Sequence, residues 1–352
     1  MASPRFQRWA AGFPPTRRIA RRNTRALFDL CAGFVYAQVL AACVRLDLFA
    51  ILAEGPAGLD ALARRLGLPP ENAQRLCLAA ASLELVRALP DGRFALADLG
   101  AALHGNPGVQ AMIDHHALLY ADLADPVALL RGEAGPTRLA GYWPYAAGTP
   151  VGGEAAAPYS GLMGASQAML ADDILDACDL RSVRHLMDVG GGEGAFLQAV
   201  AARHPGLALT LFDLPAVAGR AADRLVRAGL DPARIACRGG SFHDGLPDGA
   251  DAISLVRVVH DHDDEPALAL LRAAHAALPA GGRLILAEPM AGTPGAEPVG
   301  DAYFGFYLLA MGSGRPRRSA ELHAMLEQAG FATSDERRTR RPLLTRLLIA
   351  YK

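Results

Sequence analysis

The stretch from Leu186 to Pro215, LMDVGGGEGAFLQAVAARHPGLALTLFDLP, constrains the fold of this chain more than any other segment. An apolar strand pattern enters a glycine-rich turn, a helical pattern follows, and a second apolar strand pattern ends at Asp213. The glycines Gly190 to Gly192 allow a tight turn and a close approach of the backbone to a ligand. The N–H groups that open the next helix face the same place. The segment therefore predicts an α/β domain with a nucleotide-type site.

The turn by itself leaves its ligand open. It can be a purely structural link between a strand and a helix. The spacing Gly190-x-Gly192-x-x-Ala195 also satisfies the permissive form of the dinucleotide fingerprint. Asp213 stands at the tip of the second strand, where an acid accepts hydrogen bonds from two ribose hydroxyls. If the turn binds a ligand, we expect that ligand to contain a ribose.

Length and composition limit the class of protein. A chain of 352 residues suggests two domains, and a hydrophobic content of 51% supports a large core. The formal net charge of −1 gives no overall field that would attract nucleic acid. The five cysteines are scattered and lack CxxC spacing, so we expect buried thiols in a reducing cytoplasm and no zinc site.

The first 26 residues contain seven arginines and no acidic residue. They lack the apolar core and the cleavage site of a secretion signal. The longest apolar run, Cys31 to Val44, is too short to span a bilayer and contains Gln38. We therefore expect a soluble cytoplasmic protein. Its basic start is either a solvated arm or subunit contact, or a segment that rests on the anionic surface of the inner membrane.

The first half of the chain is predicted to be helical. A long amphipathic stretch covers residues 26–53, and two short helices follow, separated by a break from Gly67 to Pro70. Their apolar positions are Leu59, Leu62, Ala63 and Leu66 in the first helix and Leu76, Leu78, Leu83 and Leu85 in the second. Asp91-Gly92 then turns a short hairpin. Helix, turn, helix and hairpin together predict a winged helix.

A winged helix often binds DNA, so a transcriptional regulator is a competing interpretation. A helix that reads DNA needs Arg or Lys and polar side chains on its exposed face. The second helix, from Glu71 to Leu85, offers Arg75 as its single basic residue and is rich in Ala and Leu. Such a surface suits burial against protein, which favours dimerisation.

Between the winged helix and the glycine turn, a third helical stretch contains the pair His115-His116. Neighbouring residues of a helix point about 100° apart, so the pair cannot bind one metal ion together. Residues 132–157 are rich in Gly, Pro and Ala, and we expect a mobile connection there. Its aromatic residues Tyr142, Trp143 and Tyr145 either line an apolar pocket or anchor the loop.

From about Ser182 strands and helices alternate. Strands are expected at 184–189, 207–212, 251–257, 282–287 and 344–351, with a short irregular strand after Phe331, and helices at 160–179, 195–204, 215–228, 265–278 and 319–329. Alternation predicts a mostly parallel sheet covered on both faces. Because no helix separates the last two strands, we expect a Rossmann-like sheet that ends in an antiparallel pair.

The sequence VVHDHDDEP follows the strand at 251–257 and places His260 at a strand's carboxyl end, where α/β folds hold reacting groups. His260, His262 and the acids that follow form either a metal cluster or the start of a helix. The acids at 263–265 and Pro266 together make a well-formed helix N-terminus. His260 is left over by that assignment, which makes it the candidate general base.

A neutral imidazole can take the proton of a hydroxyl group as the oxygen attacks. A carboxylate behind the imidazole fixes its tautomer and stabilises the imidazolium. Glu288, at the tip of the next predicted strand, is well placed for this role. Asp261 is a second candidate.

These segments resemble a known family. DVGGGxGA with FDLP, and HDxxDE with LILAE, resemble the S-adenosylmethionine (SAM) dependent small-molecule O-methyltransferases of plants and bacteria, the caffeate and acetylserotonin type. The resemblance covers nearly the whole chain. It implies a basic arm (1–25), a helical winged-helix dimerisation domain that also lines the substrate site (26–157), a class I SAM methyltransferase domain (158–352), and a homodimer.

The same resemblance implies a set of site residues. The cofactor-binding residues would be Gly190, Gly192, Asp213, Leu214, Ser241, Phe242 and Arg257, and the catalytic residues would be His260, Glu288 and Asp261. Asp213 would bind the ribose of SAM, and Leu214 would lie beside its adenine. His260 would be the base, and Glu288 would orient it.

The chain departs from the family pattern at several positions. Where the family has Gly-Asp before Met or Phe, this chain has Ser241 before Phe242, so one carboxylate contact to the adenine is lost. The family's GKER turn is GRPR here, and Pro316 replaces its acid. Arg257 lies next to the position, here Val256, that is often basic in plant members. We therefore expect the base to depend on Glu288, with help from Asp261.

Apolar and aromatic residues in the helical domain and at 300–311 suit an apolar acceptor substrate. Several segments resemble sequences of the bacterial carotenoid 1-hydroxyl O-methyltransferases, among them RVVHDHDD and EPMAGTPGAEPVGDAYFGFYLLAM. That resemblance implies a tertiary alcohol as acceptor. The alternatives are a phenol or polyketide O-methyltransferase, a SAM-binding scaffold without activity, and a winged-helix regulator.

Overall fold

The computed structural model describes residues 3–142, 167 and 170–352, and the chain divides into two compact units, residues 1–114 and 115–352. Each unit is considered by itself. The predicted domain limits after residues 25 and 157 remain predictions. The second limit lies outside the described residues, as do Trp143 and Tyr145.

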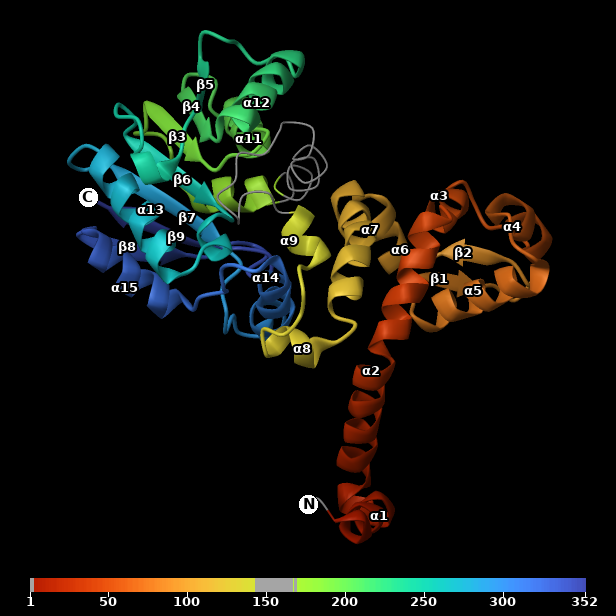
Figure 1. Cartoon of the computed structure of the whole chain (residues 1–352). Coiled ribbons are helices and arrows are strands. Elements are labelled where there is room, and N and C mark those ends of the chain that lie inside the picture. The colour runs from red at the N-terminus through yellow and green to blue at the C-terminus, as the bar shows by residue number, and fades with distance from the viewer. Residues whose placement is uncertain (1–2, 143–166, 168–169) are drawn as a thin grey trace. The chain divides into compact units, whose positions relative to one another are not determined.

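The first unit consists of helices and one small hairpin (Figure 1). Its elements are α1 (Pro4–Gly12), α2 (Pro14–Arg45), α3 (Leu48–Ala53), α4 (Leu59–Leu66), α5 (Pro70–Ser82), β1 (Val86–Ala88), β2 (Phe94–Leu96), α6 (Asp98–His104) and the first half of α7 (Pro107–Asp122). β1 and β2 pair antiparallel, with Val86 opposite Leu96. Helix, turn, helix and hairpin therefore follow in the predicted order.

One apolar core holds this unit together. α4 contributes Leu62, Ala63 and Leu66, which are buried as their spacing predicts. The core also contains side chains from α2, α3, α5 and the hairpin, among them Cys43, Leu48, Cys77, Ala80 and Val86.

The second helix of the winged-helix pattern is shorter than the sequence predicts. α5 ends at Ser82, so Leu83 and Leu85 lie beyond it. Glu84 adopts a left-handed backbone with φ 60°, which no helix continues through. Leu78, within the helix, is 51% exposed. The helical prediction is therefore wrong at Leu83 and Leu85, because the chain turns directly from α5 into the hairpin, although Leu85 is still buried in the core.

α2 extends well beyond the apolar run at its centre and is 32 residues long. By length and composition alone it is apolar enough to cross a membrane, and it is the one helix of that kind in the described part of the chain. Its last turns, however, place Ala41, Cys43 and Val44 in the core of the first unit. That end of the helix is therefore part of a protein interior.

The second unit contains a large sheet and its covering helices (Figure 1). The first elements after α7 are α8 (Pro126–Leu130), α9 (Arg138–Tyr142), a helix at 170–177, β3 (His185–Val189), α11 (Ala195–Arg203), β4 (Ala208–Asp213), α12 (Pro215–Arg227) and β5 (Ile235–Gly239). The 3-10 turn η1 (Phe242–Asp244), β6 (Ala252–Val256), the 3-10 turn η2 (Val259–Asp261), α13 (Asp264–Ala277) and β7 (Arg283–Glu288) follow. The chain continues with the π-helix η3 (Pro298–Phe304), α14 (Gly305–Met311), α15 (Ser319–Ala329), β8 (Thr333–Arg337) and β9 (Arg346–Tyr351).

Seven of the described strands form one sheet in the order β5-β4-β3-β6-β7-β9-β8. β3 to β7 pair in parallel, and β9 runs antiparallel to both β7 and β8. The Rossmann-like sheet and its antiparallel finish are thus confirmed. The sequence analysis gave no range for β5, whose exposed Arg238 and Gly239 break the apolar run of an inner strand.

The sheet is covered on both faces. α13 and α15 pack on one face against residues such as Ile253, Leu255 and Leu284. The helix at 170–177, α11 and α12 pack on the other face against residues such as Leu186 and Leu209. Because β3, β4, β6 and β7 are parallel, their carboxyl ends meet at one edge, and the predicted site residues follow those ends.

Candidate active site

The glycine turn joins β3 to α11 and is held between strand ends. Gly190 has φ +68°, a left-handed conformation that favours glycine. A Cβ atom there would lie 2.8 Å from Cγ2 of Val258, so no side chain fits. The Gly190 N–H donates to the carbonyl oxygen of Phe212 (2.8 Å), which ties the turn to the end of β4.

Asp213, the last residue of β4, closes this turn. Its Oδ2 accepts from the N–H of Gly192 (2.8 Å), and its Oδ1 accepts from the N–H of Leu214 (2.7 Å). Each carboxylate oxygen can accept one more hydrogen bond. Burial raises the pKa of Asp213 to about 6, although the two backbone donors lower it. Gly192 has open space where a Cβ would stand. The carboxylate therefore keeps acceptor capacity for the hydroxyl groups of a ligand.

Asp188 lies beneath the same turn, and the sequence analysis did not single it out. Its Oδ1 accepts from the Ser254 hydroxyl (2.6 Å) across the β3–β6 pair. Its Oδ2 is buried and has no hydrogen-bond partner in the described part of the chain. Burial raises the pKa of Asp188 to about 7. A buried carboxylate oxygen without a donor, directly below Gly191, fits a ligand that brings a donor or a positive charge.

Ser241 and Phe242 form the next side of the site, after β5. The Ser241 hydroxyl accepts from the backbone N–H of His243 (3.2 Å) and so caps the short turn η1. The Phe242 ring lies edge-on to His262 at 5.1 Å between centroids. Phe242 packs partly buried on the core of the α13 face.

His260 lies in η2, directly beyond the end of β6, and is buried. Its Nδ1 hydrogen-bonds to Oε2 of Glu288, the last residue of β7. The other oxygen of Glu288 accepts from the N–H groups of Val258 (3.1 Å) and Val259 (2.8 Å). One buried carboxylate thus orients both the imidazole and the backbone that carries it. The bond at Nδ1 leaves Nε2 as the nitrogen that can receive a proton.

Asp261 contributes a second carboxylate to this group. Its Oδ1 lies 3.1 Å from Nε2 of His260. Burial lowers the pKa of His260, but the charges of Asp261 and Glu288 outweigh burial, and the net result is a raised pKa. Burial raises the pKa of Asp261 to about 6. An imidazolium formed at His260 is therefore stabilised from both sides.

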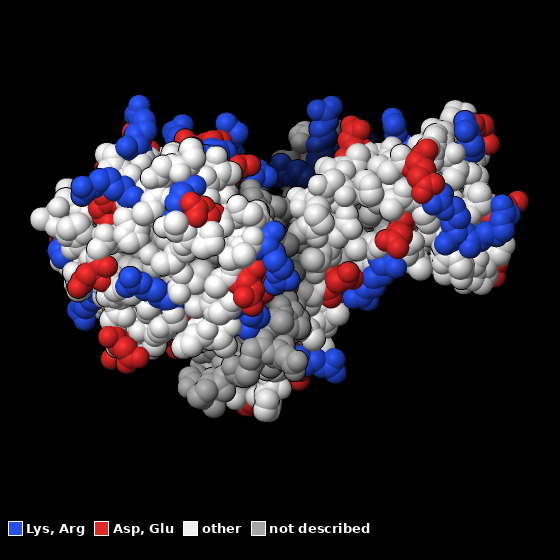
Figure 2. All heavy atoms as spheres, turned by 90° about the horizontal axis from the view of Figure 1, so that it is seen from above, with Lys and Arg blue, Asp and Glu red and all other residues white. Residues whose placement is uncertain are grey.

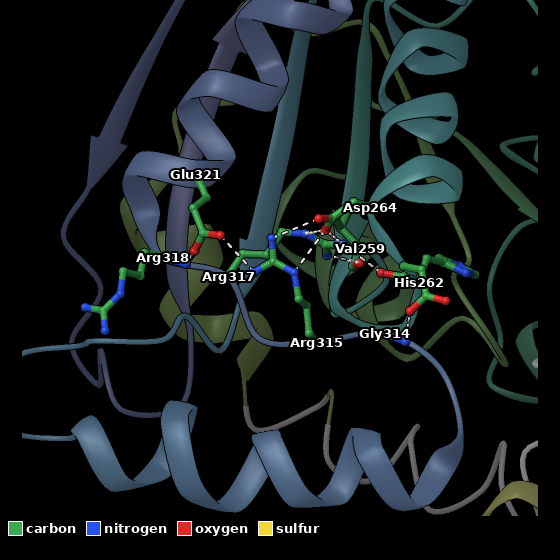
Figure 3. A network of polar contacts seen from close by, with 9 residues as sticks. Val259, His262, Asp264, Gly314, Arg315, Arg317, Arg318 and Glu321 are labelled. Carbon is green, nitrogen blue, oxygen red and sulfur yellow. Dashed lines mark hydrogen bonds and ion pairs between the residues drawn. The ribbon is translucent and has the colours of Figure 1, made fainter. Parts of the chain in front are cut away.

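The acids after the base begin a helix, as predicted. α13 starts at Asp264, and Asp263 occupies the preceding cap position. Both side chains also bind residues of the GRPR turn (residues 314–317), shown in Figure 3. The N–H of Gly314 donates to Asp263 (2.9 Å), and Arg317 donates to Asp264.

The GRPR turn donates hydrogen bonds to the backbone around His260. Arg317 is 2% exposed and donates to the carbonyl oxygens of Val259 and His262, each at 2.8 Å (Figure 3). The N–H of Arg315 donates to the carbonyl oxygen of His260 (2.9 Å). A Cβ at Gly314 (φ +80°) would lie 2.2 Å from that same oxygen. The turn lacks an acid at Pro316, but it supplies donors to the carbonyl oxygens of Val259, His260 and His262.

Arg257, between β6 and the base, has a left-handed backbone (φ 57°), which is strained for a residue with a side chain. Its N–H donates to the carbonyl oxygen of Ala287 (2.8 Å), which holds the chain beside β7. Its guanidinium lies 5.4 Å from the ring centroid of Phe304. The Phe304 ring in turn lies edge-on to His260 at 5.7 Å.

Phe304 belongs to an aromatic wall formed by Tyr303, Phe304 and Tyr307 of η3 and α14. His116 Nε2 lies 2.8 Å from the Tyr303 hydroxyl, and His115 Nε2 lies 2.8 Å from the Tyr307 hydroxyl. Burial lowers the pKa of His115 to about 4 and also lowers the pKa of His116. Burial raises the pKa of Tyr303 to about 12. The wall and its histidines are therefore neutral near pH 7, which suits an apolar ligand.

The structure thus places His260 in direct contact with both Glu288 and Asp261, at the ends of β6 and β7. It places Gly192, Asp213 and Leu214 together at the ends of the neighbouring strands β3 and β4. Asp188, Arg317 and the tyrosine partners of the two histidines were not predicted from the sequence. The acid of DVGGG was a visible signal for Asp188. No sequence signal pairs Arg317 with carbonyl groups more than fifty residues earlier.

Comparisons with known proteins agree along nearly the whole chain. Residues 120–332 match the O-methyltransferase domain, and residues 28–106 match the O-methyltransferase dimerisation domain. The chain is 50% identical to the demethylspheroidene O-methyltransferase of Cereibacter sphaeroides over 94% of this chain and 87% of that protein. It is 47% identical to the protein of the same name from Rhodobacter capsulatus, over 96% and 84%.

Among solved structures, that of human N-acetylserotonin methyltransferase in complex with SAM matches this chain with a TM-score of 0.76 and 22% sequence identity. The match covers 94% of this chain and 97% of that protein's chain. This likeness shows the shared fold.

The buried hydrogen bonds of Arg317 predict a large loss of stability when its side chain is replaced. Arg317→Met removes one of the two donors to the buried carbonyl oxygen of Val259 and the guanidinium donor to the carbonyl oxygen of His262, so we expect a loss of about 2 to 4 kcal/mol in the free energy of unfolding, measured by urea denaturation. Arg318→Met is the matched control, because that side chain is 64% exposed, and it should change stability by less than about 0.5 kcal/mol. Equal stability of the two variants would show that the buried bonds contribute nothing.

The pair of carboxylates predicts how His260 titrates. In Glu288→Gln, one charge that raises the pKa of His260 is gone while burial remains, so the pKa of His260 should fall. NMR of the histidine ring protons, assigned with a His260→Gln variant, measures it. Glu133→Gln, at an exposed site, is the control. A pKa that stays or rises in Glu288→Gln contradicts the assigned cause.

Proposed function

The chain belongs to the O-methyltransferase family, and on that premise we propose that it methylates a hydroxyl group of a carotenoid with His260 as general base. The family matches span most of both units, and two relatives are 50% and 47% identical over 87% and 84% of their own length. The protein is therefore an O-methyltransferase.

The methyl donor is S-adenosylmethionine, which supplies an electrophilic methyl group on a sulfonium. Asp213 would accept hydrogen bonds from its ribose hydroxyls, and Gly190 and Gly192 let the backbone lie close to it. Leu214 and Phe242 would flank the adenine, and Ser241 offers a neutral oxygen beside them. The buried, unpaired Oδ2 of Asp188 supports this assignment, because a cationic ligand would supply what it lacks.

The base works through the contacts around its ring. Nε2 of His260 would take the proton of the acceptor hydroxyl as that oxygen bonds to the methyl carbon. Glu288 holds the Nδ1–H and stabilises the imidazolium that results. The carboxylate of Asp261, 3.1 Å from Nε2, would also stabilise the positive charge of the imidazolium. The observation that carries this role is the buried His260–Glu288 bond at the ends of adjacent strands.

The acceptor assignment is supported by the two relatives, whose names are those of demethylspheroidene O-methyltransferases. It is also supported by the neutral aromatic wall beside the base, since an apolar polyene alcohol offers few polar groups to recognise. The acceptor would be a tertiary alcohol, which is less acidic than a phenol. Proton removal would then have to accompany methyl transfer, which makes the base more important.

The match to a dimerisation domain supports a homodimer. We also propose a cytoplasmic location that is peripheral to the inner membrane, where a carotenoid acceptor would be found.

The role of His260 predicts a separation of binding from turnover. His260→Ala should keep the SAM dissociation constant within about twofold and lower turnover by roughly 100- to 10,000-fold, measured with labelled SAM. Asp213→Ala is the reciprocal variant and should weaken SAM binding about tenfold or more. Full turnover in His260→Ala would remove it from the role of base, and unchanged binding in Asp213→Ala would remove the ribose contact.

The acceptor is tested with the purified enzyme, labelled SAM and two sets of detergent-solubilised acceptors, 1-hydroxy carotenoids and phenols. We expect label in the carotenoid ethers, and no label with carotenoids that lack the hydroxyl. Label in phenols alone would replace the carotenoid assignment by a phenol or polyketide O-methyltransferase. No label in either set, with SAM bound, would indicate a scaffold without activity.

A further inference from the structure

The amino-terminal arm, defined here as residues 4–25, carries a strongly basic surface that packing within its unit leaves open. It consists of α1 and the first turns of α2, which lie against each other (Figure 1). The Thr16 hydroxyl donates to the carbonyl oxygen of Ala10 (2.7 Å), which helps to fix the corner between the helices. All seven arginines of the arm are exposed: Arg5, Arg8, Arg17, Arg18, Arg21, Arg22 and Arg25.

The arginines of α2 share one side of the helix. At 3.6 residues per turn, Arg17, Arg18, Arg21, Arg22 and Arg25 fall within about 140° of its circumference. In the described part of the chain, the one ion pair found for the arm's arginines joins Arg25 to Asp29 at 3.8 Å, and it is largely exposed.

Apolar side chains occupy the other side of α2. Ile19 and Leu27 lie there and are 52% and 64% exposed. Leu30 and Phe34 continue the same side of the helix within the residues that match the dimerisation domain. α1 adds an aromatic cluster. Its Phe6, Trp9 and Phe13 rings lie at 5.7 Å and 4.9 Å between centroids, and Trp9 is 54% exposed. The arm and the adjoining turns therefore expose aromatic and apolar groups beside a dense row of cations.

We infer that this arm binds the surface of an anionic lipid bilayer, with Trp9 and its neighbouring apolar side chains in the interface and the arginines against the lipid phosphates. Basic amphipathic helices with Trp, Phe and Leu on the apolar side bind in this way. Elsewhere, on the face that Figure 2 shows, basic and acidic side chains are interspersed, so the arm differs in its charge.

A second copy of this chain fits the arm less well. If the arm met the same arm of a second copy, seven arginines without an acid before Asp29 would face seven more, and like charges repel. The match to the dimerisation domain also begins at residue 28, beyond the basic row. A bilayer span fits less well too, because the last turns of α2 are buried in protein core and its first turns hold five arginines.

This inference names the membrane partner of the proposed peripheral location, but it does not rest on the acceptor. Binding to lipid is measured without SAM or acceptor, so it can fail while the methyl transfer stands, and the reverse also holds.

The test uses the full chain and two kinds of vesicle, phosphatidylcholine alone and phosphatidylcholine with roughly one-third phosphatidylglycerol. In sedimentation, we expect strong binding to the anionic vesicles and weak binding to the neutral ones. Arg17→Gln/Arg21→Gln/Arg25→Gln should lower the partition coefficient about 100-fold. The matched control Arg87→Gln/Arg131→Gln/Arg338→Gln removes the same charge at exposed sites and should bind as the unchanged protein does.

Two further readouts identify the occupant. The chain has two tryptophans, so in a Trp143→Phe background Trp9 alone reports, and its emission should shift to the blue with anionic vesicles. Light scattering should show the same oligomeric state for the triple arm variant and its control. Equal binding of both variants, or an unshifted Trp9, overturns the inference. Loss of the dimer in the arm variant assigns the arm to the subunit contact instead.

Discussion

The carboxylate of Glu288 is the interaction on which the candidate active site depends. It stands at the last position of β7 and accepts from the imidazole of His260 and from the backbone of Val258 and Val259. Two parallel strands that are adjacent in the sheet thereby share one buried acid. Such an acid is stable in a protein interior only when its donors are fixed, and here the sheet fixes them. The position of His260 is therefore fixed by a carboxylate that also binds its own backbone segment.

A second set of contacts to the residues around His260 comes from a segment more than fifty residues later in the chain. The GRPR turn donates to peptide groups on both sides of His260 through Arg315 and the buried Arg317. The family pattern places an acid beside the ring here. In this chain Pro316 occupies that position, and the turn acts on the backbone rather than on the imidazole. The nearby Asp261 provides the second carboxylate to the ring.

Much of this arrangement was predictable, for identifiable reasons. Apolar runs that end in Asp213, His260 and Glu288 predict strand tips, and parallel strands bring their carboxyl ends to one edge. The glycine turn is predictable because a left-handed Gly190 leaves few alternatives. Predictions failed where tertiary context outweighed local pattern. Leu83 and Leu85 look helical but lie on either side of Glu84, in the turn that ends α5, and β5 was overlooked because an edge strand has little apolar signal.

The sequence by itself determined the class of fold, the ligand turn and the identity of the candidate base, because periodicity and local motifs act over short distances along the chain. Tertiary structure alone decided which groups surround the base. Arg317, the aromatic wall and the tyrosine partners of His115 and His116 come from segments far apart in sequence. Their effects on charge and burial arise only when packing excludes water from between them.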